Sequence, residues 1–329
     1  MIGKYCKKDE CLQLILHIVE QAFKGCPFAV YPTGKVVSLL KKDFIVLSIC
    51  LVIIISSVYF FQQNQIAKES ITYFPIDPSV SFPTAVTKLE LGKKRYDEYS
   101  IEWETKSIVN KKAYLRQNMG LLYANGRLIN TMGAWKQNTM ELTEHKTVVE
   151  RDSRLFQAVA FHYAEIHDEN DRIFSSQKLS SNHLYVINSK FDQTPLGFST
   201  PRTGEERQWK NTLDEETEDV IEYQLNAAVK HYSISLEEYP IRIFLTELAA
   251  YNDKPIPGFT QAQTANIIGQ LTEGLYKNYF LGITKEDGTI TKAVGSTVPV
   301  ILFGKDHLLV VFTTGDNQPV ILRQQISTS

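Results

Sequence analysis

The chain has 329 residues, with 35 Lys and Arg, 37 Asp and Glu, and a formal net charge of −2 at pH 7. That balance does not fit the strongly basic surface of a nucleic-acid-binding protein. Its four cysteines, too few for a disulfide scaffold, lie in the first 50 residues, so the sequence after them has no thiol nucleophile and no thiolate metal ligand.

An uninterrupted apolar run extends from Phe44 to Phe61 (FIVLSICLVIIISSVYFF). Its uncharged residues would cover roughly 27 Å as a helix, close to the hydrocarbon thickness of a bilayer. Phe44 at one end and Tyr59 to Phe61 at the other would lie at the two interfaces. The sequence therefore predicts a single N-terminal transmembrane helix over residues 44–61, with the membrane lipid bilayer as its partner.

Charges on either side of the run predict its orientation. Lysines cluster before it, whereas within about 20 residues after it only Lys68 follows. The sequence thus predicts a short cytoplasmic tail over residues 1–43, with a net charge of +3, and an extracytoplasmic C-terminal part with a net charge of −5. The cysteines on the N-terminal side are Cys6, Cys11, Cys26 and Cys50; with His17, they match no zinc-site spacing.

Two alternatives concern the N-terminal region. A cleaved signal peptide would have a shorter apolar core and small residues at its cleavage site, but this run leads into QQNQIAKES. Translation beginning at Val36 or Val37 would leave a short basic leader before the span, and the first 35 residues would then not be protein.

Residues 62–84 read as a stalk. The segment is polar and then contains Pro75, Pro78 and Pro83, which favour extended backbone and obstruct regular strand pairing. Residues 85–329 are then expected to form the extracytoplasmic domain.

This domain is predicted to begin with β structure. Apolar and polar residues alternate from Asp97 to Glu104, as on a half-buried strand. Asn125-Gly126 separates two apolar segments and predicts a tight type I′ hairpin. Residues 155–166 are apolar on both faces, as in a central strand, with the small side chains of Ala158, Ala160 and Ala164 on one face, where a helix could approach. Residues 183–187 read as another strand.

Helical periodicity follows. Residues 214–232 place Ile221, Leu225 and Ala228 on one stripe, with acidic residues expected in the first turns. A second helix is predicted after Tyr239, although its IRIFL segment also fits a strand. A third is predicted from Thr260 to about Asn278, opened by the capping box Thr260 to Gln263.

The last 45 residues return to β structure. Residues 298–303, 308–313 and 320–326 are separated by turn sequences and predict a three-stranded meander. The order of strands, helices and strands predicts an α+β fold, an antiparallel sheet domain with an inserted helical section.

No motif for catalysis or ligand binding stands out. Two short elements match those of penicillin-binding transpeptidases: S-x-x-K at Ser175 and Lys178, and S-x-N at Ser180 and Asn182. They are too close together in the sequence, and no K-T-G follows. The densest set of potential ligands comprises His162, Glu165, His167, Asp168 and Asp171. On a strand, however, His162 would face opposite to Glu165 and His167, so the three could not converge without a bend.

The sequence predicts no catalytic, cofactor or metal residues. We expect a membrane-anchored, extracytoplasmic binding or regulatory module of the bacterial cell envelope, non-enzymatic, whose partner is an envelope protein or cell-wall component and not a nucleic acid. The alternatives are an envelope hydrolase whose active site follows no motif and a transmembrane signalling protein.

Overall fold

The computed structural model describes residues 73–189, 194–285 and 288–326. The predicted cytoplasmic tail, the transmembrane helix from Phe44 to Phe61 and the first part of the stalk lie outside these residues. Within them, no helix is long and apolar enough to cross a bilayer. They belong to one compact unit that begins at Lys68.

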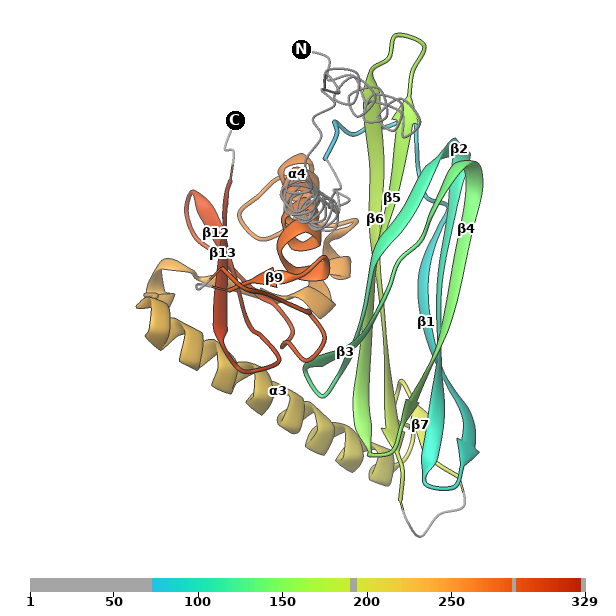
Figure 1. Ribbon diagram of the computed structural model, residues 1–329, viewed down its shortest axis with the longest axis vertical. Coiled ribbons are helices and arrows are strands. Elements are labelled where there is room, and N and C mark those ends of the chain that lie inside the picture. Colours follow the sequence, from blue (N-terminus) through green and yellow to red (C-terminus); the bar gives the residue numbers. More distant parts are fainter. Residues whose placement is uncertain (1–72, 190–193, 286–287, 327–329) are drawn as a thin grey trace, which may run out of the picture. The chain divides into compact units, whose positions relative to one another are not determined.

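The described unit is an α+β structure with large antiparallel sheets, as predicted (Figure 1). The first sheet has seven strands: β1 (Thr84–Arg95), β2 (Glu98–Ala124), β3 (Arg127–Met132), β4 (Trp135–Glu150), β5 (Arg154–His167), β6 (Ile173–Ile187) and β7 (Leu196–Phe198). The second has four strands: β8 (Ile241–Phe244), β11 (Val300–Phe303), β12 (His307–Thr313) and β13 (Pro319–Gln325). A small pair, β9 (Ile283–Thr284) and β10 (Ile290–Thr291), lies outside both sheets.

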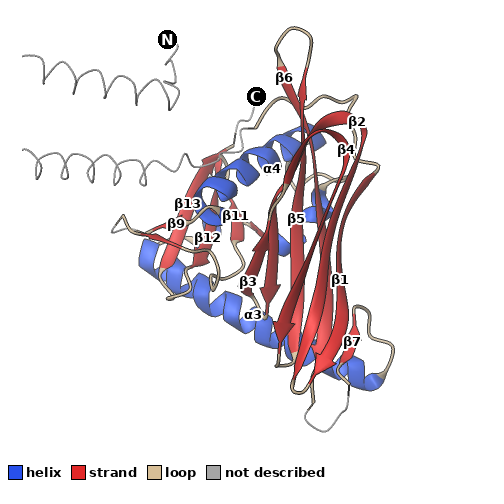
Figure 2. Cartoon of the chain, turned by 45° about the vertical axis from the view of Figure 1, so that its right-hand side comes forward, coloured by secondary structure: helices blue, strands red, loops and turns tan. Residues whose placement is uncertain are grey.

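Strand β2 belongs to two layers of the first sheet. Its first half pairs with β1 and β4, and its second half pairs with β3 and β5. The β4 register is interrupted between Ile108 and Ala113, where one layer passes into the other. The layers face each other, because Trp103 from the first half of β2 shares a buried cluster with Leu122 from its second half and Leu184 from β6. The sheet is therefore folded into a sandwich (Figure 2).

The other face of the second layer carries the main core. Val159 and Phe161 of β5 pack into a cluster with residues of α3 (Gly204–Tyr232), α4 (Gln261–Leu275) and the four-stranded sheet. Short helical turns complete this part: η1 (Leu236–Glu238), η2 (Leu245–Tyr251) and η3 (Tyr276–Phe280).

Several local predictions are confirmed. Asn125 and Gly126 join β2 to β3 with φ of 44° and 76°, the positive values that a type I′ turn requires. The predicted third helix is α4, with Thr260 as N-cap and Gln263 completing the capping box. The C-terminal meander is β11 to β13, and residues 155–166 are the buried strand β5.

Three expectations were wrong. Helix α3 begins at Gly204, ten residues before Asp214, because Thr203 and Glu206 form a capping box there and Trp209 and Leu213 extend the apolar stripe. The acidic residues that follow Asp214 therefore lie inside the helix and not in its first turns.

After Tyr239 the chain forms strand β8, the alternative noted for IRIFL, because Ile241 and Ile243 pair with β11. The face of β5 that carries Ala158 and Ala164 meets the opposite layer of the sandwich, whereas the helices cover the other face.

The described end of the predicted stalk packs on the unit. We call residues 73–83 the strap. Ile76 forms a parallel bridge to Ser175 of β6, flanked by two main-chain hydrogen bonds of 2.8 Å. Val80 and Phe82 are buried, and the Tyr73 N–H donates to Glu273 of α4 (2.9 Å). The strap thus joins β6 to α4.

Gly269 provides a direct test of the strap. A Cβ at this position would lie 2.0 Å from the Tyr73 ring. We expect Gly269→Ala to displace Tyr73, lower the free energy of unfolding by about 1–3 kcal/mol and accelerate protease cleavage within the strap. In Gly274→Ala, on the same helix, the new Cβ meets nothing within 4 Å, and we expect a gain of about 0.5–1 kcal/mol. Equal effects of the two substitutions in thermal unfolding would show that the strap is not held at Gly269.

Candidate functional site

The serine and lysine group on β6 does not form an active site. Ser175 is fully buried and its hydroxyl donates to the Phe74 carbonyl (2.6 Å), while that of Ser176 donates to Val80 (2.9 Å). Lys178 lies 3.9 Å from Asp253 at the surface. Ser175 and Ser176 therefore hold the strap against the sheet, and the resemblance to a transpeptidase motif is accidental.

The densest group of potential ligands does not converge either. His162 is fully buried, whereas His167 is exposed and contacts Glu165 (2.6 Å). Asp168 accepts main-chain hydrogen bonds from Asn170 and Arg172, and the Arg172 bond is the main reason that the pKa of this carboxyl is lowered. The group is a polar strand end followed by a turn. In the described part of the chain, no three His, Cys, Asp or Glu side chains could hold a metal ion together.

His162 is the centre of a buried chain of side-chain hydrogen bonds, which we call the His162 chain. Its Nδ1 lies 2.7 Å from Ser107 Oγ and its Nε2 lies 2.7 Å from Ser180 Oγ. Ser180 continues to Thr87 Oγ1 of β1 (2.6 Å), and Ser107 accepts a hydrogen bond from Gln117 Nε2 (2.8 Å). These residues connect β1, β2, β5 and β6 inside the sandwich.

The bonding pattern assigns a neutral imidazole. Ser107 already accepts from Gln117, so its hydroxyl hydrogen donates to Nδ1, and His162 Nε2–H donates to Ser180. Burial, together with the charge of Lys178, lowers the pKa of His162 to about 3. A proton at Nδ1 would leave the Ser107 hydroxyl without an acceptor. The site is closed to solvent and has no carboxylate, so His162 acts here as a structural residue.

The low pKa of His162 predicts a pH-dependent stability. Below its ordinary pKa of 6.5 the unfolded chain binds a proton there and the folded protein does not, so stability falls from pH 6.5 down to about 3. At pH 5 the loss relative to pH 7 is about 2 kcal/mol. Urea unfolding at several pH values should show this slope, and His162→Gln should remove it. His145→Gln, on the exposed outer face of β4, should retain it; a slope unchanged in His162→Gln would contradict the assignment.

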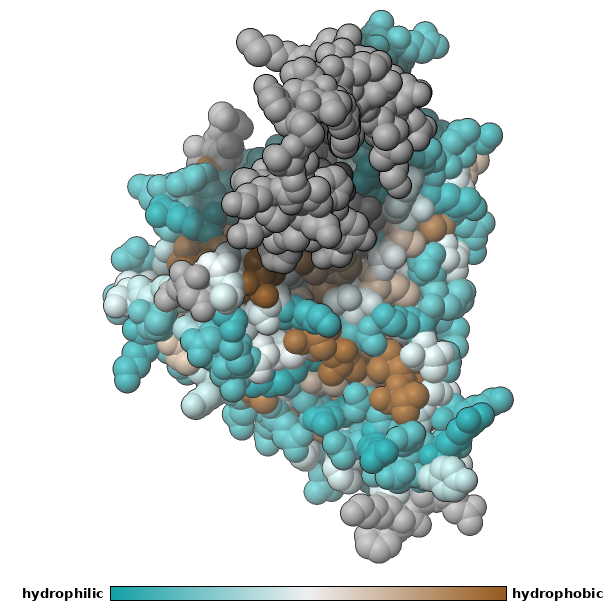
Figure 3. Space-filling model, in the orientation of Figure 1, coloured by the Kyte–Doolittle hydropathy of each residue, from teal (hydrophilic) through white to brown (hydrophobic). Residues whose placement is uncertain are grey.

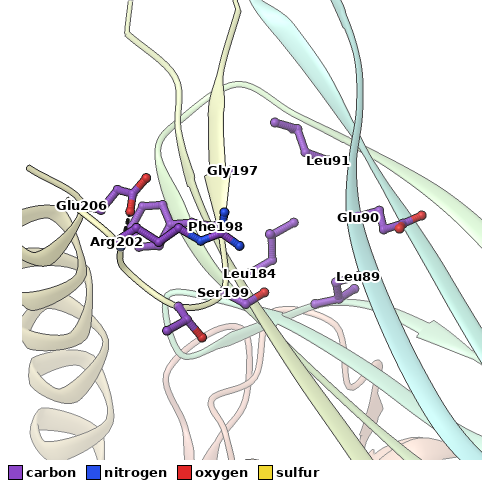
Figure 4. A pocket seen from close by; sticks show the side chains of 10 residues that line it. Leu89, Glu90, Leu91, Leu184, Gly197, Phe198, Ser199, Arg202 and Glu206 are labelled. Atoms are coloured by element: carbon purple, nitrogen blue, oxygen red, sulfur yellow. Dashed lines mark hydrogen bonds between the residues drawn. The ribbon is translucent and has the colours of Figure 1, made fainter.

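A cavity of about 750 Å³ lies between β1 and β7; we call it the edge cavity. It is lined by residues 89–91 of β1, Leu184 of β6, residues 197–200, and Arg202 and Glu206 at the start of α3. Figure 4 shows Leu89 and Leu91 pointing toward β6 and β7, and Glu90 pointing away from them. Phe198 is fixed by stacking on Tyr185, with ring centroids 5.2 Å apart.

The lining shows that this cavity runs along strand edges. Side chains of consecutive strand residues point to opposite faces of a sheet, yet three consecutive residues of β1 and four from Gly197 onward line the same space. That is possible where the space borders the main chain at the edge of each strand. β1 and β7 are the two ends of the sheet path, and among the described residues neither has a ladder partner on this side.

One cation stands out among the charged groups of the edge cavity. Glu90 pairs with Lys88 (2.6 Å). The Glu206 carboxylate accepts hydrogen bonds from the main-chain N–H groups of Arg202 and Thr203, and the Arg202 bond is the main cause of its lowered pKa. The positive charge of Arg202 also contributes to the lowered pKa of Glu206. Among the described residues, no hydrogen bond engages the Arg202 guanidinium.

Two smaller cavities are lined by charged groups that are mostly paired. One, of about 560 Å³, borders the strap, and its Lys111 contacts Asp77 (3.2 Å). The other, of about 520 Å³, lies beside the β2–β3 turn, where Asn125 donates to Glu216 (3.2 Å). The edge cavity is therefore the better candidate for a binding site.

The sequence did not reveal the edge cavity, since its lining comes from three separate segments without a motif. One signal was present: Thr203 and Glu206 have the spacing of a capping box and mark the start of α3 beside the cavity. Which strands lie at the sheet edges depends on pairings between distant segments. The local sequence pattern therefore does not predict them.

Comparisons with known proteins identify no family. No family model matches the chain, and no curated protein matches it significantly. Among solved structures, it resembles the "crystal structure of a putative lipoprotein (ycdA) from Bacillus subtilis subsp. subtilis str. 168", at 12% identity over 71% of this chain and 69% of that chain, with a TM-score of 0.18. Similarity this low does not establish a common fold.

Proposed function

We propose that this protein is a membrane-anchored, extracytoplasmic binding module of the bacterial cell envelope, without enzymatic activity. The observation that carries the proposal is the edge cavity, an open space bordered by apolar side chains, two free strand edges and one guanidinium. Such a concave surface can hold a ligand by contact with its apolar side chains and its few polar groups. The proposed partner is an envelope protein or a cell-wall component.

Anchoring rests on the uncharged run from Phe44 to Phe61 and on the lysines before it. The strap and the edge cavity lie at different places on the described unit. The chain enters it through the strap, which contacts Ser175 of β6, whereas the edge cavity borders Leu184 on the same strand. These two positions are about 30 Å apart along β6. A protein tethered through the strap would thus present the cavity away from its attachment.

The exposed apolar side chains of the described unit are a second place to look for a docking face. In the view of Figure 3, apolar side chains form a band across the middle of this face, with hydrophilic side chains around it. Large exposed apolar residues are spread over unrelated elements, among them Tyr96, Val149, Tyr223 and Ile290. Recognition through the edge cavity explains binding better than a broad apolar contact does.

A hydrolase is the second candidate, and Ser199 with His183 is its best support near the cavity. The Ser199 hydroxyl, however, donates to the His183 carbonyl (2.9 Å), and His183 Nε2 donates to the Ser199 carbonyl (2.9 Å). Each side chain bonds the other residue's main chain, so the imidazole is not placed to take the hydroxyl proton. This arrangement extends the contact between β6 and the segment after β7, and it favours the binding module. The signalling alternative depends on residues 1–43.

Membrane flotation of the full-length protein tests the anchor. We expect it to float with vesicles and to resist extraction at high pH, because an apolar span is held by the bilayer interior. A variant that lacks residues 44–61 should remain soluble. Release of the full-length protein by alkaline carbonate would contradict a spanning anchor.

Site-specific photocrosslinking tests the binding site. A photoreactive residue at Thr200, on the rim of the edge cavity, should yield a discrete adduct in intact cells, whereas the same residue at the exposed Glu237, outside the cavity, should not. Identical adduct patterns at the two positions, or none at Thr200, would argue against the edge cavity as the binding surface.

A further inference from the structure

We propose that a second surface of the described unit, on the outer face of β2, β4 and β5, binds a sugar ring of the cell-wall glycan. We call this surface the aromatic platform. Its members are Tyr114 and Arg116 of β2, Trp135 of β4, and Glu165 and His167 of β5. The inference goes beyond the binding site proposed above, because Glu165 lies opposite Ser175 of β6, whereas the edge cavity borders Leu184, about 30 Å away along that strand.

Strand pairing places the five side chains of the platform on one face of the sheet. Arg116 lies directly opposite Trp135, and Tyr114 lies directly opposite Glu165. Directly opposite residues of antiparallel strands point to the same face, and so does His167, two residues after Glu165. The residues between them on β2 and β5 point into the sandwich core. The platform therefore points outward.

The platform is the open part of a face that is otherwise covered. Toward the middle of β5 this face carries Phe161 and Tyr163, which are only 1% and 2% exposed. Trp135, in contrast, is 52% exposed. The other two tryptophans of the chain are packed, Trp103 inside the sandwich and Trp209 beside β7. One large aromatic ring thus remains available for a ligand to cover.

Arg116 supplies hydrogen-bond donors beside Trp135. Its Nη2 lies 3.5 Å from Glu165 Oε2, and no hydrogen bond engages its guanidinium among the described residues. The other oxygen of Glu165 lies 2.6 Å from His167 Nε2, and the His167 ring packs on Tyr114 with centroids 4.9 Å apart. The carboxylate is thus held from one side and keeps the guanidinium in place, while the N–H groups of Arg116 stay free for a ligand.

This combination of groups matches a sugar ring. One face of a pyranose carries C–H groups that pack on an aromatic side chain, and its edge carries hydroxyls that accept hydrogen bonds from a guanidinium. The charges of Arg116 and Glu165 offset each other, so the platform does not favour an ionic polymer of either sign. A neutral ligand with both an apolar face and hydroxyl groups fits best, and a cell-wall glycan offers such rings in series.

Saturation-transfer NMR on the full-length protein in nanodiscs tests this inference, with empty nanodiscs as the blank. The probe is chitotetraose, a neutral chain of N-acetylglucosamine units. We expect a dissociation constant of about 1 mM or lower. Trp135→Ala should weaken binding at least tenfold, because the stacking surface is lost. Tyr223→Ala, which removes an exposed aromatic ring from α3, should bind as the wild type does. Absence of binding by the wild type at about 10 mM, or equal binding by Trp135→Ala, would overturn the proposal.

The rival occupant of the platform is the bilayer surface, since tryptophan favours membrane interfaces and the strap lies at this end of β6. Nanodiscs that contain brominated lipids distinguish the two. We expect the tryptophan emission of the wild type to be as bright in brominated as in ordinary nanodiscs. Quenching that disappears in Trp135→Phe would show that the ring contacts lipid and would overturn the proposal. If the Thr200 adduct forms in cells while chitotetraose does not bind, the platform is wrong and the edge cavity stands.

Discussion

The arrangement of this unit depends on how the folded sheet is closed between β1 and β6. No ladder of main-chain hydrogen bonds joins these strands, although they lie against each other. Two kinds of buried contact cross this boundary. Leu89 shares an apolar cluster with Leu184 and Val186, and Thr87 is hydrogen-bonded to Ser180 at the end of the His162 chain. Side chains thus close the sandwich here, where a continuous barrel would use the backbone. A buried polar chain of this kind is stabilising while each member keeps its partner, and losing one member costs about 1–3 kcal/mol.

This closure explains where the edge cavity lies. At Thr87 and Ser180 the two strands are held together by hydroxyl groups, and further along, at Leu89 to Leu91, the strands are separated by the space that the cavity occupies. β7 is short and pairs only with residues 185–187 of β6, so it borders the space without filling it. The same interaction that stabilises the fold therefore leaves two strand edges open beside it.

The rest of the β6 edge is covered in a different way at each position. The strap pairs with Ser175, the Asn252 side chain exchanges two hydrogen bonds with the main chain of Leu179, and Ser199 bonds His183. Covering an edge prevents unwanted pairing with other chains. The uncovered edges of β1 and β7 at the cavity are thus a local exception, which is one reason to regard them as functional.

Local patterns in the sequence were sufficient for elements that are determined locally. The Asn125-Gly126 turn, the Thr260 cap of α4 and the C-terminal meander depend on neighbouring residues, and all three were predicted. The bend of β2 was not, because it is fixed by pairings with four other strands. The alanine face of β5 was assigned to a helix because small side chains allow any close neighbour, and only the tertiary fold shows that the neighbour is the other layer. The start of α3 was missed although Thr203 and Glu206 signalled it.

The candidate site could not be predicted from the sequence, because its residues come together only in the tertiary fold. His162 was noted as a potential ligand, but its two hydroxyl partners lie on other strands, 55 and 18 residues away. The edge cavity combines leucines, a glycine and one arginine, none of which is distinctive alone. The cavity exists because β1 and β7 have no ladder partner on this side in the described unit. That is a property of the sheet topology and not of any single residue.

Hydrogen exchange tests the closure of the sandwich most directly. Ser180→Ala removes the contact with Thr87 and leaves His162 without its second partner, while the four-stranded sheet is untouched. We expect amides of β1 to exchange at least tenfold faster in this variant, because β1 can separate from β6. Amides of β11 and β12 should exchange no faster than the change in the global free energy of unfolding explains. Unchanged protection of β1, or a uniform loss across both sheets, would contradict this closure.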